Sequence, residues 1–238
     1  MMSRVTNPDD DSRTRKNGQA RAGRARMSGR ERREQLISVG RRLFAEKGFD
    51  GTTVEDIAAH ANVSKPVVYE HFGGKEGVYA VVVDREIDAL LGSITDALTS
   101  DGNSRVLVER AALALLDYVE SSSDGFRILV RDSPTGQQTG SFASLMSDVA
   151  SQVEYILVDA FKKQKLDAKT APLYAQMLVG MVALTGQWWL DNRKLKKADV
   201  AAHLVNLAWH GLSTLEPHPK LVDEAAAGPA STGILKDA

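Results

Sequence analysis

Nine residues between positions 52 and 75 carry the groups best suited to bind a polar partner. Hydroxyl, ammonium and imidazole groups can donate hydrogen bonds to phosphate oxygens or to the edges of bases, and small apolar side chains can contact a base methyl group. The nine residues are Thr52, Thr53, Ser64, Lys65, Pro66, Val67, Tyr69, His71 and Lys75. The secondary structure predicted around these residues indicates which kind of partner they could bind.

Two short helices on either side of a tight turn are predicted to present these residues. Thr52 and Glu55 have the spacing of a capping box that opens the first helix. Asn62 stands at the turn, where it tolerates a left-handed backbone better than most residues. Ser64 is expected to cap the second helix, with Pro66 in its first turn. This order is a helix-turn-helix, whose second helix enters the major groove of DNA.

An ordinary helical hairpin in an all-α core has the same pattern, but two features favour DNA. Lys75 lies in the first turn of the next helix, where the helix dipole disfavours a cation unless a phosphate also binds there. Nine Lys and Arg residues between positions 13 and 33 are interrupted by a single acid. We therefore expect Lys65 to donate to guanine N7 and O6, and Val67 to contact a thymine methyl group.

Charge is distributed unevenly along the chain. Residues 1–80 contain 15 Lys/Arg and 11 Asp/Glu, whereas residues 81–238 contain 15 and 20. This asymmetry suits a DNA-binding domain joined to a domain that stays off DNA. Residues 1–29 have almost no large apolar residue, which predicts a disordered basic arm, either a solubilising tail or an arm that contacts phosphates or the minor groove. The Pro/Gly/Ala-rich residues 217–238 predict a disordered tail.

Composition excludes several classes of protein. The chain has 238 residues, is 43% hydrophobic and contains no cysteine, which suits a globular protein without disulfides or thiolate metal sites. No apolar run is long enough to span a membrane and no signal peptide is evident, so we expect a cytoplasmic protein. The five histidines do not cluster with carboxylates, so no metal and no cofactor are expected. Without an acid–base or nucleophile constellation, we predict that the protein is not an enzyme.

Helical periodicity over most of the chain predicts an all-α fold with two domains. Residues 30–75 would form a three-helix DNA-binding domain containing the helix-turn-helix, and residues 76–216 a larger helical domain for ligand binding and dimerisation. A helix of about 24 residues starting at Lys75, about 36 Å long, would connect the two as a lever. Its expected apolar stripe consists of Ile87, Leu91, Ile94 and Leu98.

The last two predicted helices are apolar on two faces. One face can pack on the protein's own core, and the other needs a second partner, most simply the same helices of another subunit around a two-fold axis. A fully internal position is the alternative. We expect a homodimer whose interface, or the core just beneath it, contains Met181, Trp188, Trp209 and Leu212.

Motifs in the order Leu43-Phe44-Ala45-Glu46-Lys47-Gly48-Phe49, Thr52-Thr53-Val54, Ile57-Ala58, Val63-Ser64, Val68-Tyr69-x-His71-Phe72 and Lys75-Glu76 run through this region. Together they resemble the DNA-binding domain of TetR-family transcription regulators. The resemblance implies that Tyr69, His71 and Lys75 bind the DNA backbone and that Thr52 caps the helix approaching it. Lys65-Pro66 departs from the small or hydroxyl residues common in the family, which leaves the operator sequence open.

A second resemblance covers short motifs of both domains: Ser64-Lys65-Pro66-Val67-Val68-Tyr69, Leu178-Val179-Gly180-Met181, Trp189-Leu190-Asp191 and Ala208-Trp209-x-Gly211-Leu212. They are similar to the actinobacterial TetR-type regulators of fatty-acid biosynthesis, which implies a sensor of long-chain acyl-CoA. A long apolar pocket is then expected, and an ordinary packed core is the alternative. The candidate lining residues are Leu98, Val106, Phe126, Leu129, Met146, Val149, Met177 and Trp189.

These observations predict a homodimeric transcription regulator that binds double-stranded DNA at a pseudopalindromic operator. A hydrophobic small molecule would release the regulator from DNA or retune its binding. The more specific prediction is that this molecule is a long-chain acyl-CoA and that the regulated genes are lipid genes. One alternative is a TetR-type repressor of an efflux or catabolic operon that senses another apolar compound. The other is an architectural DNA binder without a ligand, which an interior without a cavity would favour.

Overall fold

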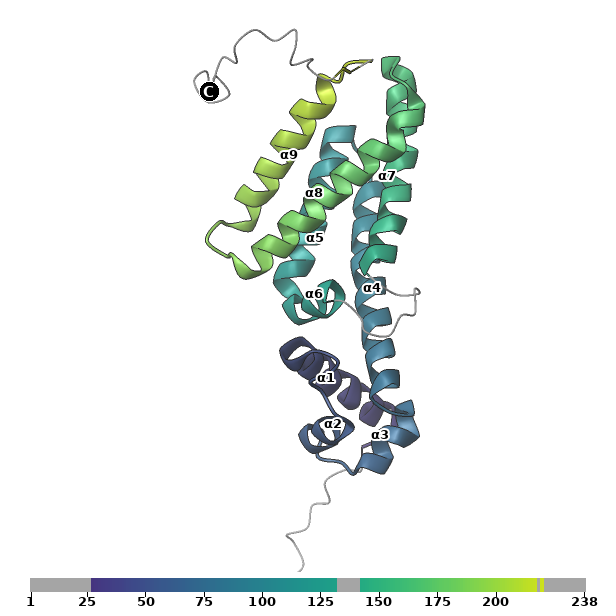
Figure 1. The fold of residues 1–238 in the computed structure, drawn as a ribbon, viewed down its shortest axis with the longest axis vertical. Helices are drawn as coiled ribbons and strands as arrows, with labels where there is room; N and C mark the ends of the chain where they lie inside the picture. The colour runs from purple at the N-terminus through teal and green to yellow at the C-terminus, as the bar shows by residue number, and fades with distance from the viewer. Residues whose placement is uncertain (1–26, 132–141, 218, 221–238) are drawn as a thin grey trace, which may run out of the picture.

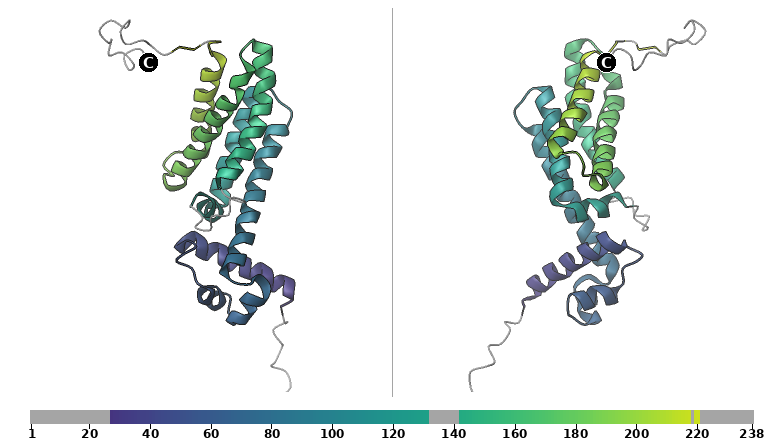
Figure 2. Two further views of the ribbon diagram at one scale, coloured as in Figure 1. Left: turned by 45° about the vertical axis from the view of Figure 1, so that its right-hand side comes forward. Right: turned by 90° about the vertical axis from the view of Figure 1, so that its left-hand side faces the viewer.

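The computed structural model describes residues 27–131, 142–217 and 219–220, and the regular structure in these ranges is helical. A small and a larger group of helices lie at opposite ends of an elongated molecule (Figure 1, Figure 2). The elements are α1 (Gly29–Lys47), α2 (Val54–His60), α3 (Lys65–Phe72), α4 (Lys75–Thr99), α5 (Ser104–Ser121), α6 (Ser123–Val130), α7 (Phe142–Gln164), the 3-10 helix η1 (Ala168–Thr170), α8 (Ala171–Asp191) and α9 (Lys197–Ser213). The predicted all-α class is confirmed, whereas most of the predicted arm and tail lies outside the described residues.

Local sequence explains how α1 begins and ends. Ser28 is its N-cap and forms a reciprocal capping box with Glu31, and Gly48 ends it with a φ of 76° that favours glycine. The inward face includes Leu43 and Phe44, each 1% exposed. Burying side chains of this size contributes about 1.5–3 kcal/mol each, so this face anchors the small domain.

The capping box of α2 differs from the predicted one by one residue. Thr53 is the N-cap and Asp56 its reciprocal partner, so the predicted pair of Thr52 and Glu55 is wrong. Thr52 is fully buried, and its hydroxyl donates to Gly48 O at 2.8 Å. Because the Thr52 hydroxyl is engaged by a backbone carbonyl in the core, the next residue, Thr53, caps α2 instead.

The turn between α2 and α3 agrees with the prediction. Asn62 adopts a φ of 53°, in the left-handed region. Ser64 is the N-cap residue of α3, and Pro66 lies in its first turn, although the Ser64 hydroxyl makes no capping hydrogen bond. Thus α2 and α3 form the expected helix-turn-helix beside α1.

The lever helix α4 extends from the small domain into the larger one (Figure 1). Its 25 residues correspond to about 37 Å. Ile94 and Leu98 are buried as predicted, but Ile87 and Leu91 are only half-buried. Six of the eight buried residues of α4 follow an i, i+4 series instead: Val78, Val82, Glu86, Leu90, Ile94 and Leu98. This series contains one charged residue, Glu86.

In the larger domain, α4 and α7 pack side by side, α8 covers α7, and α9 covers α5. In contrast, α8 and α9 make few contacts with each other, and side chains of both helices line a cavity. At the other end of this domain, α6 packs on α1 and α4, which joins the two domains. The two domains therefore share one hydrophobic core, which continues from α1 through α4 to α9.

Candidate DNA-binding surface, interdomain joint and apolar cavity

The first turn of α3 faces solvent at the far end of the small domain (Figure 1). Ser64, Lys65 and Pro66 are exposed, and Tyr69 is 54% exposed one turn further on. Val68 is fully buried and holds the helix on the core. The arrangement places the Ser64 hydroxyl, the Lys65 ammonium and the Tyr69 hydroxyl on the solvent-exposed side of α3.

Val67 and His71 are less exposed than predicted. Val67 is half-buried and packs against the core cluster, so it does not project fully outward. The backbone carbonyl of His71 accepts a hydrogen bond from Arg33 Nη1 at 2.8 Å, and the Arg33 guanidinium lies 4.3 Å from the centre of the Phe72 ring. Arg33 of α1 thus holds the end of α3, a role that the sequence did not indicate.

Thr52 acts inside the protein, contrary to its predicted role at the DNA, and Lys75 makes contacts within the protein that the sequence did not predict. The Thr52 side chain has no exposed surface with which to contact a phosphate. Lys75 Nζ donates to Phe49 O and to Thr52 O, both at 3.0 Å, and lies 4.2 Å from the centre of the Phe49 ring. These two carbonyls give the lysine in the first turn of α4 partners within the protein and engage two of its three N–H donors.

Acids at the start of α2 have separate partners. Asp56 accepts hydrogen bonds from the Thr53 hydroxyl at 2.9 Å and from Lys47 Nζ at 3.1 Å. Glu55 forms an ion pair with Lys65 of α3. Its hydrogen bond with Lys65 is the main reason that the pKa of Glu55 lies below its usual value. This pair therefore joins the start of α2 to the start of the recognition helix.

A partly buried ionic joint, formed by Arg41, Glu86, Tyr118 and Ser122, connects the two domains. Glu86 Oε1 accepts from Arg41 Nε at 2.6 Å, and Glu86 Oε2 accepts from Tyr118 Oη at 2.5 Å and from Ser122 Oγ at 3.1 Å. Arg41 also donates to Ser122 at 2.6 Å. Burial, followed by the hydrogen bond to Glu86, raises the pKa of Tyr118 well above its usual value. The joint thus ties α1, α4 and the end of α5 together.

Close approach of α6 completes this junction. A Cβ atom at Gly125 would lie 1.8 Å from Glu86 Oε2 and 2.8 Å from Tyr118 Oη, so no larger residue fits there without movement. At the end of α6, Arg131 Nη1 donates to Ala45 O in the last turn of α1 at 2.8 Å. A movement of α6 or of the part of α4 at the joint would therefore displace α1 of the small domain, to which both are hydrogen-bonded.

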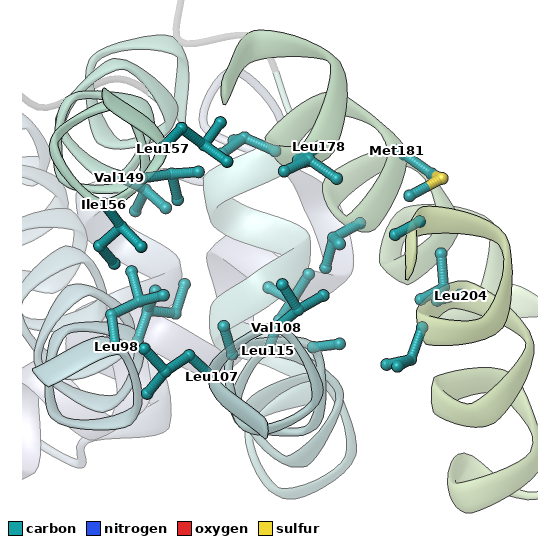
Figure 3. A pocket seen from close by; sticks show the side chains of 18 of the residues that line it. Leu98, Leu107, Val108, Leu115, Val149, Ile156, Leu157, Leu178, Met181 and Leu204 are labelled. Atoms are coloured by element: carbon teal, nitrogen blue, oxygen red, sulfur yellow. The ribbon is translucent and has the colours of Figure 1, made fainter. Parts of the chain in front are cut away.

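An apolar cavity lies between α4, α5, α7, α8 and α9. The volume of the cavity is about 100 Å³, so the cavity is narrow. Figure 3 shows labelled side chains from all five helices around this space. Among the predicted lining residues, Leu98, Met146 and Val149 are at the cavity.

The other five predicted lining residues lie elsewhere. Phe126 and Leu129, 0% and 4% exposed, belong to the close-packed core of α6. Met177 is 55% exposed on the outside of α8. Trp189 is buried, but its indole N–H donates to Leu195 O at 3.0 Å and its ring is covered by Arg193. Val106 packs near Gly102, outside the cavity wall. Helical periodicity could not separate a cavity wall from ordinary core.

Three of the four predicted interface residues, Met181, Trp209 and Leu212, are half-buried and line the cavity where it meets α8 and α9. The fourth, Trp188, is 52% exposed. It belongs to an exposed apolar stripe on α8 that consists of Leu173, Met177, Leu184 and Trp188.

In the described part of the chain, no helix combines the length and apolar character required to cross a membrane.

Family models match both of these domains. The model described as "Bacterial regulatory proteins, tetR family" matches residues 36–82, and "Tetracyclin repressor-like, C-terminal domain" matches residues 93–222. The second match alone covers more than half of the chain. The chain belongs to the TetR family. As a TetR-family protein, it is a DNA-binding transcription regulator and not an enzyme, as the sequence predicted.

Relatives of this TetR-family protein include both an activator and a repressor. The HTH-type transcriptional activator FasR of Mycolicibacterium smegmatis is 30% identical over 185 residues, which cover 77% of this chain and 84% of FasR. The HTH-type transcriptional repressor KstR2 of Rhodococcus jostii is 30% identical over 97 residues, 41% of this chain and 48% of KstR2.

Solved structures agree with the TetR fold. A TetR-like transcriptional regulator from Rhodococcus sp. RHA1 has a TM-score of 0.68 at 24% identity and covers 80% of this chain and 100% of its own. The fatty acid degradation regulator FadR from Bacillus halodurans has a TM-score of 0.61 at 18% identity, with 76% and 96% covered. At these identities the likeness establishes the fold alone.

Proposed function

We propose that the protein is a homodimeric, ligand-responsive transcription regulator that binds a pseudopalindromic operator and is released from it, or retuned, by a long-chain acyl-CoA. The observation that carries this proposal is the narrow apolar cavity in the larger domain. A regulator without a ligand would gain dispersion contacts by closing such a space, so an architectural role is disfavoured.

The DNA-binding half of the proposal rests on the exposed start of α3. Ser64 has a hydroxyl that is not used for capping, and Tyr69 presents its phenol to solvent. Both can donate to phosphate oxygens, and Lys65 can donate to a guanine in the major groove. Two such helices about 34–36 Å apart would read half-sites one helical turn apart.

Pairing of two chains is supported by the exposed apolar stripe on α8. From Ala171 to Leu190 this helix has no charged residue, although Leu184 and Trp188 are 65% and 52% exposed. A contiguous exposed apolar face is typical of an interface. An isologous contact of α8 and α9 around a two-fold axis would cover it and would place two recognition helices on one operator.

The effector class follows from the chemistry and the shape of the cavity. A slender alkyl chain suits a narrow apolar channel, and each buried methylene contributes about 0.8 kcal/mol. About ten methylenes would supply about 8 kcal/mol, whereas reversing a two-state equilibrium from 1:99 to 99:1 needs about 5.5 kcal/mol. Because the cavity is narrow, entry of a chain must move its walls, which gives the two states different affinities.

Fluorescence anisotropy of an operator duplex tests the proposal, after selection of that duplex from a random library by the purified protein. Palmitoyl-CoA should weaken or otherwise change operator binding, whereas acetyl-CoA, which has the same headgroup without a long chain, should not. By linkage, the operator should change the affinity for palmitoyl-CoA by the same factor. An operator affinity indifferent to palmitoyl-CoA would refute the acyl-CoA assignment and leave a regulator that senses another apolar compound.

A further inference from the structure

The ion pair between Glu55 and Lys65 lies where the recognition helix would meet DNA. Lys65 is the first residue of α3 and is its only lysine or arginine. The Lys65 and Glu55 side chains are 54% and 58% exposed, so both ends of the pair are open to a partner. We propose that Glu55 and Lys65 act together to read one G·C base pair in each half-site, which makes Glu55 a residue that determines operator specificity. This inference rests on the proposed operator binding.

The pair presents a hydrogen-bond donor beside an acceptor. In the major groove, guanine presents the acceptors N7 and O6, and the paired cytosine presents the N4 amino donor next to O6. The Lys65 ammonium can donate to both guanine acceptors while the Glu55 carboxylate accepts from cytosine N4. In an A·T pair the adenine amino group separates the two acceptors, adenine N7 and thymine O4, so the ammonium finds no two adjacent acceptors and the pair is satisfied less completely.

Glu55 also penalises incorrect sequences. Beside a base pair without a suitably placed amino donor, its carboxylate loses water and gains no hydrogen bond, which is costly. Its negative charge also opposes the approach of the phosphate backbone, and it neutralises Lys65 in the free protein. Binding to random DNA is therefore weakened more than binding to the operator.

Two ordinary explanations for Glu55 are available in the fold. Acids are favoured in the first turn of a helix, and exposed ion pairs contribute only about 0–1 kcal/mol to stability. Asp56, however, already occupies the capping role in this turn. A purely structural pair would affect melting temperature and binding to all DNA sequences alike, which is a measurable difference.

Selection of duplexes from a random library tests the inference with full-length wild-type protein, Glu55→Ala, Glu55→Gln and Lys65→Ala. The control is Glu34→Ala, which removes the same charge from an ion pair of similar exposure, that of Glu34 with Arg85 at 2.6 Å. Arg85 lies about 15 Å along α4 from the first residue of α4. Wild type and Glu34→Ala should select a G·C pair at one position per half-site. Glu55→Ala and Lys65→Ala should relax that same position, and Glu55→Gln, which keeps an acceptor, should retain it.

In direct binding, Glu55→Ala should bind random DNA more tightly than wild type and lose roughly tenfold in the ratio of operator to random affinity per half-site. Selection of the wild-type sequence by Glu55→Ala, or relaxation at different positions by the two alanine variants, would overturn the inference alone. The inference would also be overturned if Glu55→Ala had a lower melting temperature and an equal loss of affinity for operator and random DNA. Failure of wild type to select any sequence would overturn the proposed operator binding as well.

Discussion

Replacing Tyr118 by phenylalanine should destabilise the protein, because it removes one hydrogen bond from the joint between the domains. The Tyr118 hydroxyl donates to Glu86 Oε2 at 2.5 Å, and the residue as a whole is 7% exposed. Hydrogen bonds to charged groups contribute about 1.5–3 kcal/mol. Glu86 keeps Arg41 and Ser122 as partners, so the loss should lie at the lower end, about 1.5–2 kcal/mol.

Thermal melting gives a direct measurement of this loss. For a chain of this size, 1 kcal/mol corresponds to about 2–4 °C, so Tyr118→Phe should melt about 3–8 °C below wild type. Tyr155→Phe is the matched control, because Tyr155 is 82% exposed and undergoes the same chemical change. Equal melting temperatures for the two variants would refute the view that the joint is a stabilising contact.

The pH dependence of stability supplies an independent test of the same hydrogen bond. Because the pKa of Tyr118 is raised in the folded state, its contribution is fully present below the pKa of an unfolded tyrosine, about 10, and is lost as pH rises above that value. Wild type should therefore lose stability above about pH 10 more steeply than Tyr118→Phe. Parallel curves for the two proteins would contradict the assigned pKa shift.

Four further changes test other parts of the structure. Gly125→Ala should lower the melting temperature because its Cβ would lie 1.8 Å from a joint oxygen, whereas Gly92→Ala, with nothing within 4 Å, should leave it equal or higher. Lys75→Met should lower the melting temperature by breaking two carbonyl contacts while leaving the salt dependence of operator binding unchanged; a slope smaller by about one would instead indicate a phosphate contact. Val149→Phe should fill the cavity, so that operator binding persists but palmitoyl-CoA no longer alters it; a retained response in anisotropy would place the effector elsewhere. Leu184→Glu, at a position 65% exposed on α8, should give monomers in sedimentation with weak operator binding, and an intact dimer would exclude this stripe as the interface.

Features that depend on neighbouring residues were predictable from the sequence. The cap of α1 at Ser28, its end at Gly48 and the left-handed turn at Asn62 follow from side-chain and backbone chemistry within about four residues. The order and approximate bounds of the helices follow in the same way from apolar periodicity. The fold class and the place of the helix-turn-helix were thereby determined.

Features that depend on distant segments were decided by the tertiary structure. Lys75 has the sequence position of a phosphate-binding residue, but it contacts the carbonyls of Phe49 and Thr52, more than 20 residues earlier in the chain. Glu86 was not singled out by the sequence pattern, because its partners Arg41 and Tyr118 lie 45 and 32 residues away.

The cavity shows the same division most clearly. Periodicity identified the apolar positions of α4, α7 and α8, and among them Val149 reaches the cavity while Trp189 packs in solid core. The sequence by itself determined which residues turn inward, because that depends on helix geometry and hydrophobicity. Only the packing of whole helices against one another decided which of those residues meet neighbouring atoms and which face an open space, because a gap arises from distances between helices that no local pattern encodes.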